Sequence, residues 1–303
     1  MRVAVTGATG LIGQALCQKL IRDGDDVLVL TRSLDRAEKY LPTAKRVMWE
    51  ATSRLQNVKD LEGLDAVVHL AGASISGARW SEKQKKKIQD SRVLGTRHMV
   101  EALNGCRRRP EVLISASAIG YYGDRGNEPL DELSEPGTGF LADICQQWDR
   151  EALRARDLGI RVVLLRTGMV LSNQGGALPL MLLPFKMFVG GPLGRGRQWI
   201  SWIHIDDEVE AIRYAIAEKQ IEGALNASAP HPLTNREFSR ELGKVLNRPS
   251  LMPVPSFAVR LVLGEMGERL LLEGQCVLPR KLEAAGYDFR FPQLPEALKN
   301  LLG

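Results

Sequence analysis

Short apolar runs alternate with longer amphipathic segments through the first half of the chain. Short apolar runs bounded by turn residues are typical of buried parallel strands, and apolar positions repeating every three to four residues are typical of helices. The alternation predicts an α/β fold, a doubly wound parallel sheet of strand order 3-2-1-4-5-6 with a smaller C-terminal lobe. The predicted strands cover residues 3–5, 26–30, 46–49, 66–72, 111–117 and 162–169, and the predicted helices cover 11–21, 81–103 and 140–156.

The second half of the chain places an apolar stretch, 178–189, between two glycine-rich loops. We expect this stretch to form a wall of a pocket. Residues 225–228 predict a strand that returns to the sheet. Thr234 and Glu237 have the spacing of a capping box, and the carboxylates at 206–207 suit the N-cap or the first turn of another helix.

Three glycines at three-residue spacing join the first predicted strand to the first predicted helix. Gly7 allows a sharp turn, Gly10 lets backbone amides approach a ligand without an intervening Cβ, and Gly13 allows the helix to pack closely on the sheet. The helix N-terminus then presents a partial positive charge to a bound anion. The pattern therefore predicts a turn that binds the pyrophosphate of a dinucleotide.

The glycine turn indicates which part of the chain forms the nucleotide-binding domain. A Rossmann-type nucleotide-binding domain is expected over 1–172, and strands near 199–228 should return to it. Residues 173–303 are expected to form mainly the substrate side and the C-terminal lobe. That lobe includes a proline-punctuated and mostly helical tail from about residue 249.

The residues after the second predicted strand indicate which dinucleotide is bound. An NAD site usually places a carboxylate there, which accepts a hydrogen bond from the ribose 2′-hydroxyl. This chain instead has Thr31, Arg32 and Ser33. Arg32 can pair with a 2′-phosphate, and the hydroxyls can donate to it, so the sequence favours NADP. Arg92 is a second possible contact; the alternative for Arg32 is a surface arginine in a loop.

Hydroxyl groups end the fifth predicted strand, where the nicotinamide and substrate of such a sheet would lie. We expect Ser117 to polarise a substrate carbonyl or hydroxyl, and Tyr121 or Tyr122 to give or take a proton. Strand capping is the alternative for Ser115 and Ser117. The residues assigned to the cofactor are Gly7, Thr9, Gly10, Leu11, Ile12, Thr31, Arg32, Ser33, Leu70, Ala71, Gly72, Arg92, Ser115 and Met169.

Composition and charge restrict the classes of partner. The 303 residues are 44% hydrophobic and 25% charged, which suits a globular protein, and the formal net charge is +5. Basic runs at 85–87 and 107–109 lack the interleaved aromatic residues of a single-strand binding surface, so no nucleic acid is expected. The four cysteines lack metal-ligand spacing, and no metal is expected. No long apolar segment occurs, so we expect a cytoplasmic protein without a membrane partner.

Several stretches carry a family resemblance. Residues 6–13, 70–72, 115–123 and 202–207 resemble those of extended short-chain dehydrogenases/reductases. The resemblance implies a Rossmann-type domain and a nicotinamide cofactor. More narrowly, the chain is similar to the epimerase-family subgroup of YfcH or SDR39U1-like proteins. The stretches that carry this narrower similarity are 79–81, 91–92, 120–123, 190–198 and 271–275.

The resemblance also implies a Tyr-x-x-x-Lys pair on the helix after the fifth strand, where the tyrosine is the acid/base. This chain has Phe140 and Ile144 at those positions, and neither side chain can carry a proton. Two functions follow. One is an NADP(H)-dependent oxidoreductase or nucleotide-sugar-epimerase-like enzyme that acts on a small molecule through Ser117 and Tyr121 or Tyr122. The other is a protein that binds NADP(H) without turnover, as a redox sensor or regulator.

Overall fold

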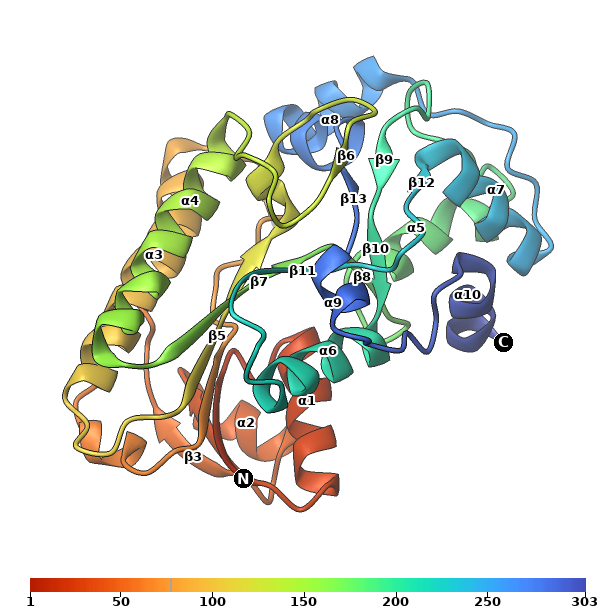
Figure 1. Cartoon of the computed structure of the whole chain (residues 1–303). Helices are drawn as coiled ribbons and strands as arrows, with labels where there is room; N and C mark the ends of the chain where they lie inside the picture. Colours follow the sequence, from red (N-terminus) through yellow and green to blue (C-terminus); the bar gives the residue numbers. More distant parts are fainter. Residues whose placement is uncertain (77) are drawn as a thin grey trace.

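The computed structural model describes residues 1–76 and 78–303, and its centre is a seven-stranded sheet (Figure 1). All neighbouring strands of this sheet run parallel, in the order β11-β7-β5-β4-β1-β2-β3. The predicted order 3-2-1-4-5-6 is confirmed, and a seventh strand extends the sheet. The strands are β1 (Arg2–Thr6), β2 (Asp26–Thr31), β3 (Lys45–Met48), β4 (Ala66–His69), β5 (Val112–Ala118), β7 (Arg161–Thr167) and β11 (Gly223–Ala227).

Helices cover both faces of the sheet, because its strands are apolar on both sides. Alternate side chains of β1 point to opposite faces: Val3 and Val5 pack in one core cluster, and Ala4 packs in the other. The first cluster includes residues of α1 (Leu11–Arg22), α2 (Leu34–Tyr40) and α6 (Ile205–Ala217); the second includes residues of α3 (Glu82–Asn104) and α4 (Phe140–Leu153).

The C-terminal part of the chain packs around a third core cluster, which lies on the opposite side of the molecule from α3 and α4 (Figure 1). Three short strand pairs lie outside the central sheet; two of them join the second half of the chain to residues before 172, and the third lies within the second half. The pairs are β8 (Met169–Leu171) with β10 (Trp202–His204), β9 (Trp199–Ile200) with β12 (Leu233–Thr234), and β6 (Pro129–Leu130) with β13 (Cys276–Val277). The helices are α5 (Ala177–Lys186), α7 (Asn235–Leu246), α8 (Ser256–Gly267), α9 (Arg280–Ala284) and α10 (Leu294–Leu302).

Local signals in the sequence place several helix ends correctly. The capping box is confirmed: the Thr234 hydroxyl accepts from the Glu237 backbone, and the Glu237 carboxylate accepts from the Thr234 backbone. In α6 the N-cap is His204, and the two aspartates occupy the first turn. The predicted helix over 140–156 ends as α4 at Leu153 and continues as a 3₁₀ turn.

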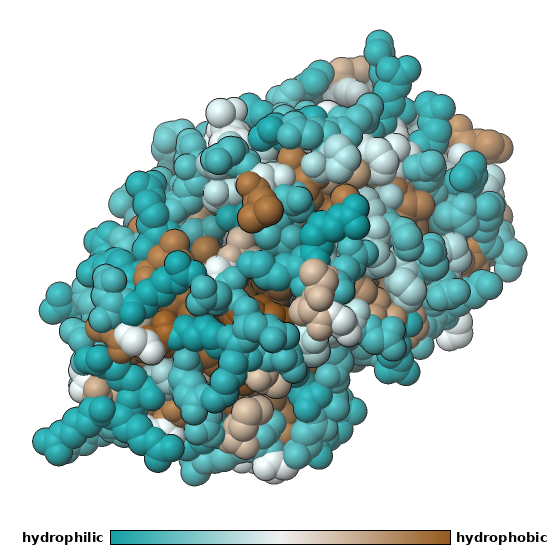
Figure 2. Space-filling view, in the orientation of Figure 1, coloured by the Kyte–Doolittle hydropathy of each residue, from teal (hydrophilic) through white to brown (hydrophobic). Residues whose placement is uncertain are grey.

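The face of the molecule in Figure 2 is mostly hydrophilic, with apolar side chains reaching the surface in separate places. Within the described ranges, no helix has the length and apolar character needed to span a bilayer.

Candidate cofactor and active site

The glycine turn between β1 and α1 has the geometry of an anion site. Gly7 has a φ of +68°, and a Cβ there would lie 2.8 Å from the Leu70 carbonyl carbon. A Cβ on Gly13 would lie 2.8 Å from the Ala8 Cα, so this glycine allows the close packing that the sequence indicates. Gly10 is exposed and is the N-cap of α1, whose N-terminus has neither a side-chain cap nor an acidic residue in its first turn. The first amides of α1, at Leu11 and Ile12, are therefore suited to a phosphate.

The turn after β2 is built from side-chain hydroxyls. The Thr31 hydroxyl accepts from the Ser33 amide at 3.1 Å and donates to the Ser33 carbonyl at 3.2 Å. Ser33 in turn caps α2 through the Arg36 amide. Arg32 is exposed on this turn. The Arg36 guanidinium lies 3.5 Å from the Thr9 carbonyl oxygen, beside the glycine turn. Arg36 is thus a second cation near the expected 2′-phosphate, which the sequence analysis missed because only the tertiary structure brings it to Thr9.

The end of β4 is fixed by a buried hydrogen-bond chain. The Thr6 hydroxyl accepts from the Ala71 amide at 3.0 Å and lies 2.8 Å from Nδ1 of His69. Nε2 of His69 is buried and has no hydrogen-bond partner among the described residues. Burial lowers the pKa of His69 to about 4. His69 is therefore a core residue that shapes the exit of β4 through Leu70, Ala71 and Gly72.

Arg92 lies against this exit from the α3 side. Its guanidinium donates to the Ala73 carbonyl at 3.0 Å and to the Ile88 carbonyl at 3.1 Å. The Arg92 Cζ is 5.2 Å from the centroid of the Trp148 ring. A Cβ placed on Gly72 would lie 3.4 Å from the same Cζ. Across residues 1–76 and 78–303, Arg92 forms no ion pair with a carboxylate. An unneutralised cation beside the end of β4 favours an anionic ligand there. Its contact with a 2′-phosphate stays a prediction.

The two serines of β5 are both buried. The Ser115 hydroxyl lies 3.4 Å from the Ala116 carbonyl oxygen, and Ser117 is opposite Arg166 in the register of β5 and β7. Ser117 is 5% exposed, and its Oγ has no partner in hydrogen-bond geometry within the part of the chain that the structure describes. The Ser117 side chain lies near the end of β5, beside the Asp149 carboxylate, and helps to lower the pKa of that carboxyl group.

Arg166 organises the residues around Ser117. Its guanidinium donates to the Tyr122 hydroxyl at 3.0 Å and lies 3.5 Å from the Asp149 carboxylate. Its Cζ is 3.4 Å from the centroid of the Tyr121 ring. The Tyr122 hydroxyl also donates to the Asn226 side chain at 2.7 Å. The sequence analysis missed Arg166 and Asp149, although an arginine inside an apolar strand is a signal of a buried polar network.

The two adjacent tyrosines have different environments. Tyr122 is fully buried, and burial raises its pKa to about 12. Tyr121 is half-buried and stacks edge-on against Tyr122, with ring centroids 5.3 Å apart. Burial also raises the pKa of Asp149, and the neighbouring Arg166 and Ser117 side chains oppose that rise only in part. Of the two tyrosines, Tyr121 is the one that a ligand can reach.

The helix α4 begins with apolar side chains where the resemblance implies an acid/base pair. Phe140 packs against Trp80, with ring centroids 5.1 Å apart, and lies 5.2 Å from the Lys85 ammonium. Ile144 is buried at 3% exposure. Neither position of α4 can donate a proton to a substrate.

Residues from the second half reach the glycine turn through a loop. Gly175 and Gly176 approach the Leu11 side chain, and a Cβ at these positions would lie 3.6 Å and 3.1 Å from it. Met169 begins β8, is half-buried, and donates its amide to the Ser201 carbonyl at 2.8 Å. The predicted pocket wall over 178–189 forms α5 and the loop after it. Arg195 and Arg197, which follow this loop, are both exposed.

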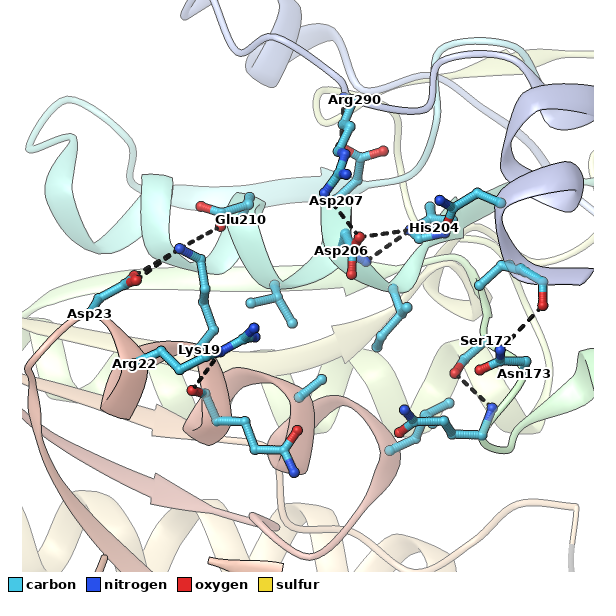
Figure 3. Close-up of a pocket in the computed structure, with 18 residues that line it drawn as sticks. Lys19, Arg22, Asp23, Ser172, Asn173, His204, Asp206, Asp207, Glu210 and Arg290 are labelled. Carbon is cyan, nitrogen blue, oxygen red and sulfur yellow. Dashed lines mark hydrogen bonds and ion pairs between the residues drawn. The ribbon is translucent and has the colours of Figure 1, made fainter. Parts of the chain in front are cut away.

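A cavity of about 470 Å³ lies between α1, α6 and the C-terminal end of the chain (Figure 3). Its charged side chains neutralise one another: Lys19 pairs with Asp23 at 2.9 Å and with Glu210 at 3.4 Å, and Arg290 pairs with Asp206 at 3.3 Å. This mutual pairing leaves little charge to select a ligand.

Comparisons with known proteins agree with this geometry. Residues 3–227 match the NAD dependent epimerase/dehydratase family, and residues 254–301 match a domain of unknown function, DUF1731. The second match lies within the tail that the sequence analysis expects from about residue 249.

Two relatives match the chain over its whole length. The chain is 43% identical to the chloroplastic epimerase family protein SDR39U1 homolog of Arabidopsis thaliana, over 100% of this chain and 87% of that protein. It is 38% identical to the epimerase family protein YfhF of Bacillus subtilis, over 100% of this chain and 98% of that protein.

A solved structure has the same architecture. The crystal structure of the human epimerase family protein SDR39U1 (isoform 2), determined with NADPH, is 35% identical in sequence and superposes with a TM-score of 0.88. The match covers 99% of each chain. With these matches, this chain belongs to the NAD dependent epimerase/dehydratase family, among its SDR39U1-like members.

Proposed function

We propose that this protein is an NADP(H)-dependent oxidoreductase or epimerase-like enzyme that acts on a small molecule. The observation that carries the proposal is the uncapped glycine turn at the N-terminus of α1, with Arg32 and Arg36 beside it. Backbone amides there suit a pyrophosphate, and two guanidinium groups suit a further phosphate.

The residues of the turn fit a nicotinamide dinucleotide phosphate. Gly10 is exposed, and among the described residues beyond its chain neighbours only the Gly7 carbonyl oxygen lies near a Cβ placed on it. The turn after β2 presents Arg32 where an NAD site would have a carboxylate. The human relative crystallised with NADPH supports the same choice. When bound, such a cofactor supplies or accepts hydride.

Side chains of the protein must then transfer the proton to or from the substrate. Ser117 would donate a hydrogen bond to a substrate oxygen, since its hydroxyl lies near the end of β5 and has only the Asp149 carboxylate beside it among the described residues. Tyr121 would give or take the proton at its hydroxyl, because it is half-buried and adjacent to the strand end. Arg166 would hold the Tyr121 ring in place and stabilise negative charge on its oxygen. In this proposal Tyr122 supports the network instead of reacting.

A second function has its own observation in its favour. Phe140 and Ile144 replace the acid/base pair on α4, and a protein that binds NADP(H) without turnover does not need that pair. A redox sensor or regulator would keep the glycine turn and the arginines without an acid/base pair on α4.

One experiment separates the two functions. Purified protein is titrated with NADPH and NADH by calorimetry, and bound NADPH fluorescence is then followed with a panel of carbonyl compounds. The enzyme predicts tight NADPH binding and oxidation of NADPH by at least one class of compound. Bound NADPH that stays reduced with every compound would favour the sensor, and no heat with either dinucleotide would contradict both functions.

A further inference from the structure

A groove lined by cations lies along α7, apart from the glycine turn. Its volume is about 980 Å³, and it is bounded by α7, by residues near 192–195 and by residues 247–253. No aspartate or glutamate is among the described residues that line it. The cations of this α7 groove are Arg195, Arg236, Arg240, Lys244 and Arg248.

Helical spacing aligns three of these cations. Arg236, Arg240 and Lys244 follow one another at intervals of four residues, which places them on one side of α7. Glu241 approaches the latter two, at 3.5 Å from Arg240 and 2.8 Å from Lys244. The other guanidinium bonds go to carbonyl groups, from Arg236 to Arg195 at 3.1 Å and from Arg248 to Asn247 at 3.1 Å. The groove therefore keeps a large positive charge.

The neighbouring helix α5 is apolar on all sides. Its inner side chains Leu178, Leu182 and Phe185 pack in the C-terminal core. On the outer side, Leu180 is 66% exposed and Leu183 is 56% exposed. A helix that is apolar all round normally has both sides covered, so this outer side indicates a binding surface.

The cationic and apolar surfaces are continuous. Phe188 follows α5 in the chain and is exposed. The Arg248 guanidinium lies 4.3 Å from the centroid of the Phe188 ring. Leu251 lines the groove and is 81% exposed, and the adjacent Met252 donates its amide to the Gly190 carbonyl at 3.2 Å. Figure 1 shows α5 and α7 on the same side of the molecule. The α5 apolar face comprises Leu180, Leu183, Met187, Phe188, Val189, Leu251 and Met252.

We propose that the α7 groove and the α5 apolar face together dock on a phospholipid surface with anionic headgroups. Headgroup phosphates would pair with the cations of the groove, and the apolar side chains would enter the interface between headgroups and acyl chains. This contact is peripheral. The sequence analysis expects no membrane partner, because the chain has no long apolar segment. That pattern does not reveal this surface, since it forms only when α5, α7 and the loop over 247–253 come together.

Other occupants fit these side chains less well. In a two-fold contact between copies, the same patch meets itself, so the groove cations of one copy would face those of the other. Single-stranded nucleic acid is held by stacking on aromatic side chains, and Phe188 is the one aromatic residue among those that make up the two surfaces described here.

The test is sedimentation of the whole protein with vesicles of phosphatidylcholine, with or without phosphatidylglycerol. Binding is expected only with the anionic vesicles and should weaken as salt is raised. Arg240→Gln with Lys244→Gln should weaken it about 30-fold, since each cation contributes ~1 kcal/mol at an anionic surface. Leu180→Gln with Leu183→Gln should weaken binding while keeping its salt dependence. Lys45→Gln with Lys86→Gln removes the same charge from β3 and α3 and should leave binding unchanged.

Several results would overturn the proposal: no binding to anionic vesicles, equal binding to neutral ones, or equal loss in the Lys45/Lys86 control. A concentration-dependent dimer in light scattering that Leu183→Gln abolishes, without vesicle binding, would assign the face to a second copy. The NADPH dissociation constant of each variant is measured alongside. If it is unchanged, the variant is folded, and the vesicle result is independent of the proposed enzymatic function.

Discussion

The Arg166 guanidinium lies over the face of the Tyr121 ring, with Cζ 3.4 Å from the ring centroid. The same guanidinium donates to the Tyr122 hydroxyl at 3.0 Å. One buried cation therefore orients both tyrosines. The Tyr122 hydroxyl is bonded on both sides, by Arg166 and Asn226, and for this reason the proposed mechanism assigns the proton transfer to Tyr121.

Tyr121→Phe is expected to lower kcat by about 10²–10⁴-fold, the usual contribution of a general acid or base. The NADPH dissociation constant should not change, because the phenyl ring still stacks on Arg166. The kcat is measured by steady-state kinetics with any compound that oxidises bound NADPH. The NADPH dissociation constant is measured by calorimetry. Tyr122→Phe should instead lower the free energy of unfolding by about 1–3 kcal/mol through its lost buried hydrogen bonds. A Tyr121→Phe protein that turns over at the parent rate would rule out this residue as the acid/base.

Arg166→Leu should destabilise the protein by about 3–5 kcal/mol, because it removes the partner of the buried Asp149 carboxylate. Denaturant unfolding measures the loss. Arg166→Leu combined with Asp149→Leu removes both charges and should recover part of it. A double variant no more stable than the single one would show that the loss comes from packing around the tyrosines.

Arg32→Ala with Arg36→Ala should reduce the preference for NADPH over NADH by about tenfold or more, since guanidinium–phosphate bonds are among the stronger charge-assisted hydrogen bonds. Dissociation constants for both dinucleotides are measured by calorimetry. Arg54→Ala, at a position whose side chain is 81% exposed in the same half of the chain, is the matched control and should keep the preference. Equal affinities for NADPH and NADH in the parent protein would contradict the assignment of the 2′-phosphate site.

Glu208→Gln should reduce the loss of folding stability that occurs as pH rises. The Thr167 hydroxyl donates to one Glu208 oxygen at 2.8 Å, and burial raises the pKa of Glu208 to about 8 from an ordinary value of 4.5. Between these values the unfolded chain is ionised while the folded chain holds a proton. The free energy of unfolding therefore falls as pH rises through this window, by at most about 1.4 kcal/mol per pH unit.

Denaturant unfolding at pH 5 and pH 8 checks this expectation. The gain in stability from Glu208→Gln should be larger at pH 8 than at pH 5. Glu135→Gln removes an exposed carboxylate and is the charge-matched control, which should show no such difference. Parallel pH profiles for the parent and Glu208→Gln would mean that Glu208 is ionised in the folded protein.

Gly13→Ala should weaken both folding and cofactor binding. Its new Cβ would lie 2.8 Å from the Ala8 Cα, and backbone has to move to make room. Overpacking of this kind costs about 1–3 kcal/mol and would displace the amides of the turn. Gly175→Ala is the control, because its Cβ would make an ordinary contact of 3.6 Å with Leu11. Thermal unfolding and NADPH titration of both variants measure the two effects.

The sequence by itself determined the sheet and the place of the cofactor turn. Strand periodicity is local, and a buried parallel strand must be apolar on both faces, so the order of strands and helices followed from the pattern. Gly7 stands where the backbone has a positive φ, and Gly13 stands where a Cβ would meet Ala8, so both constraints act within a few residues. The capping box of Thr234 is local in the same sense.

Only the tertiary structure decided which polar side chains meet. Arg166 and Asp149 are 17 residues apart, and Tyr122 and Asn226 are 104 apart. Strand register and helix packing bring these pairs together, and neither is visible in one segment alone. The packing of elements also brings Arg36 close to Thr9 and places the α7 groove next to the α5 apolar face. The physical reason is that side-chain contacts depend on the packing of whole elements, whereas turns, caps and strand patterns depend on neighbouring residues.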